Sequence, residues 1–225
     1  MGRGVTPYYE EVGITIYHAN CLDVLPTLPK VDLVLTDPPY GINACNMKLG
    51  NGAKKFHRGD WDRERPDISG LIDAGTFLCI WGGNYFTDLL PPTNHWLVWR
   101  KLNDGLSFSE CEMAWTNYGR QVRHLSRHWS GEIKDHPTQK PQPVMAWALS
   151  LCPQPVATVL DPFMGSGTTL QVAKTSGLKA IGIEIEERYC EIAVNRLRQG
   201  VLWGGGVTQL TLSIAAAPEV IEICR

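Results

Sequence analysis

The chain has 225 residues, of which 44% are hydrophobic and 20% are charged, and its formal net charge is −2. This length and composition predict one soluble globular domain with a substantial core. The small negative charge argues against a protein that is basic overall, such as a histone-like binder, although it allows a local basic groove.

The seven cysteines favour reduced thiols in the core. Their number is odd and no pair has the C-x-x-C spacing, which argues against a zinc site or a disulfide framework. The N-terminus shows no basic segment followed by an apolar run, and no segment is apolar for long enough to span a bilayer. We therefore expect a cytoplasmic protein without a membrane segment and without a metal.

Short apolar strands alternate with helical patterns along the chain, as is typical of a mostly parallel sheet covered by helices. Strands are expected at 12–17, 31–36, 76–81, 95–101, 111–117, 156–160 and 179–184. Helices are expected at 21–28, 84–90, 143–151, 168–176 and 187–198. The remaining long segments are expected to be a polar loop, a basic irregular segment and a tail with an edge-strand pattern, at 41–66, 119–135 and 200–225 respectively.

A glycine loop joins a strand to a helix in the segment VATVLDPFMGSGTTLQVAKTSG. Gly165 and Gly167 let the backbone approach a ligand closely, and the helix N-terminus offers free N–H groups. A P-loop would require Lys after Gly167, and Leu170 stands where a dinucleotide fingerprint has its third glycine. Glu184, at the end of the next strand, is placed to accept hydrogen bonds from ribose hydroxyls. This unit favours an adenosine ligand without a diphosphate; the alternative is a tight turn beside a solvated Glu184.

The tetrapeptide Asp37-Pro38-Pro39-Tyr40 directly follows the strand expected at 31–36. Its prolines fix φ and remove two N–H donors, so the segment is stiff and leaves its carbonyl oxygens free as acceptors. The Asp37 carboxylate and the Pro38 carbonyl can each accept one hydrogen of an exocyclic amino group. This frees the nitrogen lone pair for attack on a sulfonium methyl, while Tyr40 stacks on a base that must be flipped out of the duplex. The alternative is a proline turn with a surface Asp and a core Tyr.

With both motifs in place, the chain resembles the DNA amino-methyltransferases, the family that makes N6-methyladenine or N4-methylcytosine. TDPPYG matches the family's catalytic motif and LDPFMGSGTT its cofactor motif. HPTQKP, at residues 136–141, is similar to the segment that precedes the cofactor strand in the subgroup whose catalytic motif comes first. The resemblance extends to about Arg198. It implies a Rossmann-like α/β fold in circularly permuted motif order, with a seven-stranded, mostly parallel sheet, one antiparallel strand and flanking helices.

The resemblance also implies S-adenosylmethionine as the cofactor and assigns the residues of the site. Asp37, Pro38, Pro39 and Tyr40 are catalytic by this assignment. The cofactor-binding residues are Asn20, Cys21, Asp37, Thr138, Lys140, Asp161, Phe163, Gly165, Gly167, Thr168 and Glu184. Among them Glu184 holds the ribose, and Thr138 and Lys140 meet the methionine carboxylate.

One departure from the family pattern lies after the first expected strand. Relatives carry Gly-Asp-Cys there, and the Asp accepts from the cofactor adenine; this chain has Ala19-Asn20-Cys21. Asn20 offers a carbonyl acceptor without a charge. We therefore expect either weaker cofactor binding or a shared role for Asp23.

Two basic stretches with interleaved aromatic residues are expected to contact double-stranded DNA. The candidate contacts are Lys54, Lys55 and Arg58 in the loop 41–66, and Arg120, Arg123 and Arg127 in the segment 119–135. The alternative for each stretch is an ordinary solvated loop. His124 and His128 have helical metal spacing, but no third ligand is evident, so no metal is expected.

The domain organisation follows from these placements. We expect one methyltransferase domain over 1–199, with 41–66 a catalytic-side loop, 119–135 a short target-recognition segment, and 200–225 a C-terminal tail. The short recognition segment predicts a short or relaxed recognition site, and a homodimer is one way to enlarge the contact with DNA.

The sequence thus predicts a DNA adenine-N6 methyltransferase of the restriction–modification kind. Adenine is favoured because Asp at position 37 accompanies it more often in the family, whereas Ser accompanies cytosine N4. The alternatives are a DNA cytosine-N4 methyltransferase, an enzyme acting on RNA or on a protein glutamine amide, and a catalytically silent DNA-binding scaffold. The intact Asp37 and cofactor loop argue against the scaffold.

Overall fold

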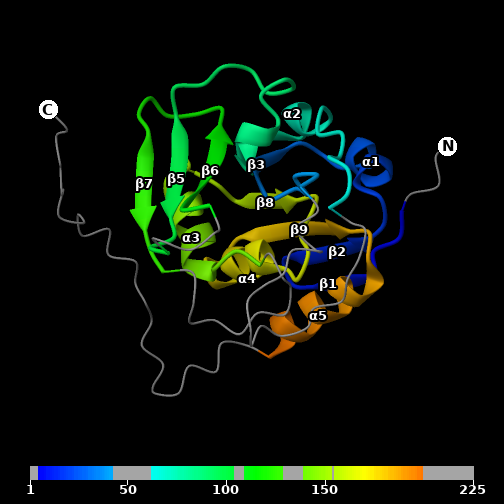
Figure 1. Ribbon diagram of the computed structural model, residues 1–225. Coiled ribbons are helices and arrows are strands. Elements are labelled where there is room, and N and C mark those ends of the chain that lie inside the picture. Colours follow the sequence, from blue (N-terminus) through cyan, green and yellow to red (C-terminus); the bar gives the residue numbers. More distant parts are fainter. Residues whose placement is uncertain (1–4, 43–61, 104–108, 129–138, 154, 200–225) are drawn as a thin grey trace, which may run out of the picture.

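A single mixed sheet organises the part of the chain that the computed structural model describes, residues 5–42, 62–103, 109–128, 139–153 and 155–199. Its nine strands lie in the order β1-β2-β9-β8-β3-β4-β6-β5-β7 (Figure 1). They are β1 (Tyr9–Glu11), β2 (Ile14–His18), β3 (Val31–Thr36), β4 (Gly75–Trp81), β5 (Trp96–Arg100), β6 (Cys111–Thr116), β7 (Arg123–Ser126), β8 (Thr158–Asp161) and β9 (Lys179–Glu184).

Most neighbouring strands in the sheet are parallel. The run β2, β9, β8, β3 and β4 is parallel throughout, and β6 is antiparallel to both β4 and β5. The two edge strands extend this arrangement, because β1 pairs antiparallel with β2 and β7 pairs parallel with β5. The α/β fold with a mostly parallel sheet is confirmed.

The number of strands corrects the seven expected from the resemblance. The expected seven are present, with β6 as their antiparallel member, and β1 and β7 are added at the two edges. These two strands have three and four residues. Such short edge strands carry too few residues for a period-2 pattern to stand out. The segment 119–135, expected to be irregular, therefore contains β7.

Helices cover both faces of the sheet (Figure 1). They are α1 (Cys21–Val24), η1 (Leu25–Thr27), α2 (Leu71–Ala74), η3 (Gly83–Tyr85), α3 (Gln142–Ser150), α4 (Thr168–Thr175) and α5 (Glu187–Arg198). One core cluster joins α3, α4 and α5 to the sheet through residues such as Leu33 and Leu35. The other joins α1 and α2 to it through Val34, Leu160 and Ile183. The alternation along β3 sends consecutive side chains to opposite layers.

Two expected helices are shorter than the sequence pattern indicated. The helix expected at 21–28 is α-helical only to Val24, because Pro26 cannot donate the next backbone hydrogen bond and the chain continues as the 3₁₀ turn η1. The helix expected at 84–90 is wrong. The chain enters a turn at Gly82, with φ +66°, and leaves helical geometry again at Phe86, with φ −123° and ψ 23°, so it makes the single 3₁₀ turn η3 instead.

Candidate active site

The carboxyl ends of the central parallel strands bring the sequence motifs together. Asp37 follows β3, while Asp161 and Glu184 are the last residues of β8 and β9. Asn20 follows β2, which pairs with β9. The Thr36 hydroxyl donates a 2.7 Å hydrogen bond to Asp161, so the strand that carries the proline motif is tied to the strand that carries the glycine loop. Ligands of open α/β sheets bind at this edge.

Asp161 holds the two ends of the glycine loop by hydrogen bonds. Its carboxylate accepts hydrogen bonds from Thr36, from the Thr169 hydroxyl at 2.5 Å and from the Phe163 amide at 3.1 Å. The side chain is buried, and burial raises the pKa of Asp161 to about 6. Because its hydrogen bonds are made within the protein, Asp161 shapes the glycine loop and does not face open space.

Glu184 holds the same loop from the next strand. One carboxylate oxygen accepts from the Gly165 amide at 3.0 Å and the other from the Glu186 amide at 2.8 Å. A carboxylate has about four acceptor positions, so Glu184 keeps capacity to accept from a ligand hydroxyl. Burial raises the pKa of Glu184 to about 7. A Cβ added to Gly165 would meet no atom within 4 Å, so space adjoins the loop beside this carboxylate. The residues fit an adenosine ribose.

Asn20 lies next to Glu184 and caps α1. Its side-chain oxygen accepts from the Leu22 amide at 3.0 Å, and the adjacent Ala19 amide donates to the Glu184 carbonyl. An amide oxygen has two lone pairs, so Asn20 can still accept one further hydrogen bond. Cys21 is buried, and burial raises the pKa of its thiol to about 11. This residue belongs to the core beneath the site.

The remaining residues of the loop face neighbouring helices. Gly167 has φ +79°, and a Cβ there would lie 2.8 Å from the Ala193 side chain, so this glycine permits α4 and α5 to approach closely. Thr168 is buried, with its hydroxyl 3.5 Å from the Arg196 guanidinium. Phe163 is half-buried against the α1–α2 core cluster.

A partly buried cluster of charges, with Lys140 as its most buried member, surrounds Asp37. Tyr40 donates a short hydrogen bond to one Asp37 oxygen, and the Lys140 ammonium lies 2.7 Å from the other. Lys140 also lies 2.6 Å from Glu112 and 3.0 Å from the Tyr40 hydroxyl oxygen. Glu112 in turn lies 2.6 Å from Lys101. Two ammonium groups therefore balance two carboxylates at the end of β3.

The pKa values in this cluster follow from burial and from the paired charges. Burial raises the pKa of Asp37; Lys140 opposes this rise and Glu112 adds to it. Burial would also raise the pKa of Glu112, but Lys140 and Lys101 lower it to about 2. Burial lowers the pKa of Lys140, yet its two carboxylate partners outweigh that and hold the pKa above its usual value.

Tyr40 is fixed both by its ring and by its backbone. The ring lies stacked on Tyr85, with centroids 4.8 Å apart and planes at 14°, and it also contacts Gly82, where any Cβ would overlap it. One Asp62 oxygen accepts from the backbone amides of Tyr40 and Gly41, at 2.8 and 2.9 Å. The motif is therefore held at the strand end by contacts from three separate segments.

Sequence reasoning missed several of these partners. Glu112, Lys101 and Tyr85 come to Asp37 and Tyr40 only through the pairing of β4, β5 and β6, and no local pattern marks them. Asp62 lies in the long loop 41–66, whose basic residues predicted contact with DNA. No local signal singles it out, because Asp60 and Asp62 both flank Trp61 and Glu64 follows.

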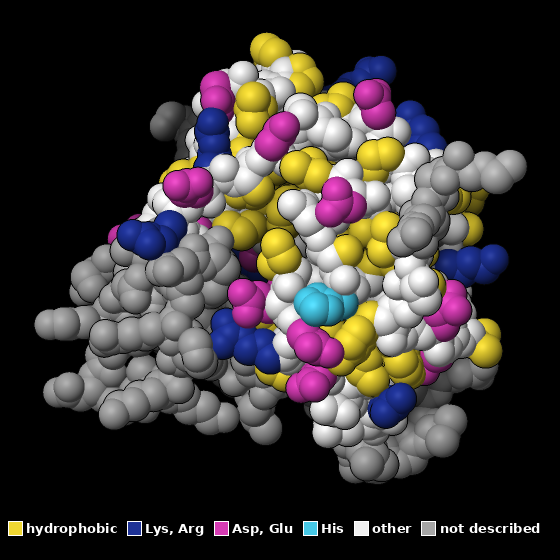
Figure 2. All heavy atoms as spheres, turned by 90° about the vertical axis from the view of Figure 1, so that its right-hand side faces the viewer, with side chains coloured by type: hydrophobic (Ala, Val, Ile, Leu, Met, Phe, Trp, Pro, Cys, Tyr) yellow, Lys and Arg dark blue, Asp and Glu magenta, His cyan; other side chains and the backbone are white. Residues whose placement is uncertain are grey.

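The basic residues assigned to DNA divide into two groups. Arg120, Arg123 and Arg127 are exposed beside or within the edge strand β7. The opposite side of the molecule, shown in Figure 2, has Lys and Arg interspersed with Asp and Glu. The other group, together with one cofactor candidate, lies outside the described residues: Lys54, Lys55, Arg58 and Thr138.

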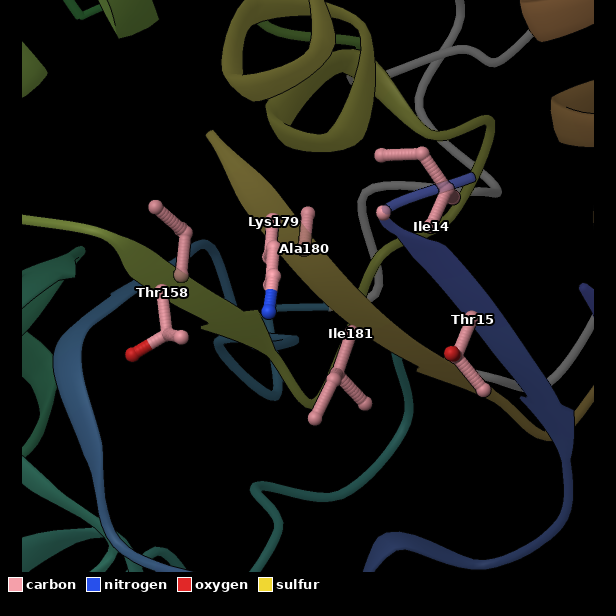
Figure 3. Close-up of a pocket in the computed structure, with 8 residues that line it drawn as sticks. Ile14, Thr15, Thr158, Lys179, Ala180 and Ile181 are labelled. Carbon is pink, nitrogen blue, oxygen red and sulfur yellow. The ribbon is translucent and has the colours of Figure 1, made fainter. Parts of the chain in front are cut away.

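One hollow of about 320 Å³ lies away from all these groups. It is lined by the first residues of β2, β8 and β9, including Ile14, Thr158 and Lys179 (Figure 3). These are the amino ends of the strands whose carboxyl ends carry the motifs, so the hollow is separate from the candidate active site. Among the described residues no cluster of ligands suits a metal ion, and no helix is long and apolar enough to cross a membrane.

Comparisons with known proteins agree with the geometry. A family model described as DNA methylase, N6_N4_Mtase, matches residues 90–195. The Type II methyltransferase M.ScaI of Streptomyces caespitosus is 45% identical, over 85% of this chain and 83% of that protein. The DNA adenine methyltransferase YhdJ of Escherichia coli (strain K12) is 44% identical over 71 residues, 32% of this chain and 24% of that protein.

A solved structure extends the likeness to the fold. The complex of M1.HpyAVI with S-adenosylmethionine superimposes with a TM-score of 0.59 at 26% identity, covering 82% of this chain and 98% of that one. The part matched by the family model, residues 90–195, includes the glycine loop between β8 and α4. The chain therefore belongs to the family of DNA amino-methyltransferases, enzymes that use S-adenosylmethionine to methylate adenine N6 or cytosine N4.

Proposed function

We propose that this methyltransferase acts on the N6 amino group of adenine in double-stranded DNA, within a short or relaxed recognition site. The observation that carries the proposal is the Thr36–Asp161 hydrogen bond of 2.7 Å. It fixes the Asp37–Tyr40 motif beside the glycine loop, so that an amino group held by the first lies next to a cofactor held by the second.

The cofactor side of the site is assigned to the loop between β8 and α4 and to the ends of β2 and β9. Glu184 keeps acceptor positions for the ribose hydroxyls, and Asn20 keeps one for the adenine amino group. Gly165 leaves the space beside them open. When bound, S-adenosylmethionine supplies a methyl group made electrophilic by its sulfonium.

The substrate side is assigned to the proline motif. The Asp37 carboxylate and the Pro38 carbonyl each accept one hydrogen of the target amino group, which draws its lone pair out of conjugation with the ring. Tyr40 and Lys140 each donate to a different Asp37 oxygen, so the carboxylate is held in one orientation and retains acceptor positions. Asp37 takes the proton that the amino nitrogen loses once it has been methylated.

The aromatic ring of Tyr40 gives the flipped base its stacking surface. In the described structure that ring is stacked on Tyr85. Tyr85 is partly exposed, so its side chain can rotate away when a base arrives. The proposed base site thus combines aromatic rings with the charged groups around Asp37, as recognition of a planar base with an amino group requires.

Adenine is preferred to cytosine on two grounds. The first is the Asp at position 37, which accompanies adenine N6 more often in this family. The second is the likeness to the E. coli DNA adenine methyltransferase over 71 residues. Both bases present a similar amino group, and the family includes cytosine-N4 enzymes, so cytosine N4 is the second candidate.

Contact with DNA is assigned to the exposed arginines around β7 and to the basic loop at 41–66. Arg120, Arg123 and Arg127 lie on one edge of the sheet, where they can meet phosphates. The short length of this segment supports a short or relaxed site. A homodimer would supply a second such edge to the same duplex.

The experiment that tests the proposal identifies the methylated nucleoside. The protein is incubated with unmethylated genomic DNA and S-adenosylmethionine carrying a tritiated methyl group, and the digested DNA is separated by chromatography. Label in N6-methyladenine, lost in Asp37→Ala and kept in the surface control Asp73→Asn, is the expected result. Label in N4-methylcytosine would overturn the assignment of adenine as the target base. Label in neither nucleoside would overturn the proposed function.

A further inference from the structure

Glu112 stands at the centre of the charge cluster without belonging to either sequence motif. It is the second residue of β6 and pairs across the sheet with Trp99 of β5. This register brings its carboxylate to Lys101, which directly follows β5, and on the other side to Lys140, which directly precedes Pro141 and α3. The carboxylate therefore joins two segments of the chain to the end of β3.

Three oxygens surround the Lys140 ammonium: those of Asp37 and Tyr40 accept hydrogen bonds from it, and that of Glu112 forms an ion pair with it. Its nitrogen lies 2.7 Å from Asp37, 2.6 Å from Glu112 and 3.0 Å from the Tyr40 oxygen. The side chain is 6% exposed, and its ammonium also lies 5.5 Å from the Trp81 ring centroid. An anion that approached Lys140 would have to compete with these three oxygens for the ammonium.

Glu112 forms ion pairs with two lysines, and Lys140 is the link between it and Asp37. A change at Glu112 therefore reaches the reacting group through Lys140. Because Lys101 holds the other oxygen of Glu112, the position of the carboxylate is fixed independently of Lys140.

We propose that Glu112 is a positioning residue for methyl transfer: by sharing Lys140 with Asp37, it fixes the ammonium against one oxygen of the Asp37 carboxylate and keeps the other directed at the target amino group. This inference rests on the proposed amino-group chemistry of Asp37. It also assigns Lys140 to the catalytic carboxylate rather than to the methionine carboxylate of the cofactor, to which the sequence resemblance assigned it.

The kinetic test compares Glu112→Gln with the wild type. Glutamine keeps the size of the side chain and removes its charge, so Lys140 loses one of its three anchors. We expect kcat to fall by about tenfold to a hundredfold, the range for a slightly misplaced catalytic group, with the KM values for DNA and cofactor changed less than about twofold. The matched control is Glu11→Gln, which breaks an ion pair of 2.6 Å with Lys174 at the far edge of the sheet. Its kinetics should be unchanged.

The pH profile separates this role from a structural one. The charged and titratable groups facing Asp37 are Lys140, Glu112, Tyr40 and, on β8, Asp161. Glu112 raises the pKa of Asp37, so removing its charge lowers that pKa. The acid limb of the kcat profile should therefore move to lower pH in Glu112→Gln. A variant that was merely less stable would keep the midpoint of that limb.

A double-mutant cycle tests whether Glu112 acts through Lys140. In Lys140→Met, Glu112 keeps Lys101 as its partner. If the inference holds, adding Glu112→Gln to Lys140→Met produces little further loss of kcat, whereas independent roles would make the two losses multiply. Multiplying losses would overturn the proposal, as would a fall in cofactor affinity with kcat unchanged.

The position of the Lys140 ammonium can also be tested without measuring activity. Nitrogen-15 NMR of lysine side chains detects ammonium groups whose hydrogens exchange slowly because they are buried and bonded. We expect a Lys140 signal in the wild-type protein, assigned by its loss in Lys140→Met, and its disappearance in Glu112→Gln. Persistence of that signal in Glu112→Gln would overturn the inference. If the wild type methylates no DNA, the proposed function fails while this measurement still decides whether Glu112 fixes Lys140.

Discussion

The ring of Tyr85 lies parallel to the ring of Tyr40, with centroids 4.8 Å apart and planes at 14°. Tyr85 belongs to η3, which follows β4, whereas Tyr40 follows β3. Neighbouring parallel strands thus deliver two aromatic rings to one point, where the flipped base is proposed to stack. The stack has to open before the base can use the Tyr40 surface.

Removing the Tyr85 ring should therefore favour base entry. An aromatic pair contributes about 0.5–1.5 kcal/mol beyond its buried area, so Tyr85→Ala is expected to tighten binding of DNA with an unpaired target adenine by about two- to tenfold. Fluorescence anisotropy in the presence of S-adenosylhomocysteine measures this affinity. Tyr85→Phe keeps the stack and should bind like the wild type; weaker binding by Tyr85→Ala would instead mean that the base is sandwiched between both rings.

Asp62 is expected to be essential for the position of the proline motif. Its carboxylate accepts from the amides of Tyr40 and Gly41, and hydrogen bonds to charged groups contribute about 1.5–3 kcal/mol each. Asp62→Ala should lower the free energy of unfolding by about 2–4 kcal/mol, measured by urea denaturation, and should lower kcat as well. Asp62→Asn keeps an acceptor oxygen and should lose less of both. Equal stability of the alanine and asparagine variants would contradict the role given to these bonds.

Cofactor binding should strengthen as pH rises through neutrality. Burial raises the pKa of Glu184 to about 7, so its carboxylate is mostly protonated at pH 6 and mostly ionised at pH 8. Protonation turns one carboxylate oxygen into an O–H donor, so the ionised form offers more acceptor positions to the ribose hydroxyls than the protonated form does. Calorimetric titration with S-adenosylhomocysteine is expected to give about tenfold tighter binding at pH 8 than at pH 6. In Glu184→Gln this dependence should disappear; a dependence that survives the substitution belongs to another group.

The two glycines of the cofactor loop should respond differently to alanine. Both have positive φ, which costs an L-residue about 1–2 kcal/mol, but only Gly167 has a neighbour in the way, the Ala193 side chain at 2.8 Å. Because overpacking adds to the backbone strain, Gly167→Ala should lower the free energy of unfolding by about 2 kcal/mol or more. Gly165→Ala should lose about 1 kcal/mol of stability yet bind cofactor more weakly, because its methyl group enters the open space. Thermal unfolding and calorimetry together distinguish the two effects.

The elements predicted best from the sequence are those with strong local patterns. β3 and β9 are continuous apolar runs, and α5 has a pronounced amphipathic period, and all three have the expected bounds. Their parallel packing also made the site foreseeable, because strand ends that carry motifs meet at one edge. The assignment of individual side chains to cofactor, base and DNA stays a prediction.

What the sequence left hidden depends on contacts between distant segments. From its sequence neighbours alone, Glu112 is an ordinary charged residue on a half-buried strand. Its importance comes from the register of β5 and β6, which sets it beside Lys101, and from the approach of Lys140 from a third segment. The same holds for Gly83, whose close packing on Trp115 of β6 has no local signal in the sequence. Such pairings are decided by tertiary structure, which overrides local propensity.

The pairing of β3 with β8 has a consequence for how the protein folds. The bonded residues Thr36 and Asp161 are separated by 125 positions along the chain, although their strands are neighbours in the middle of the sheet. Contacts between residues so distant along the chain form slowly, because a long loop must close before they contribute. During synthesis, one edge of β3 therefore stays without its native partner until β8 has left the ribosome, and the proline motif meets the glycine loop only after that.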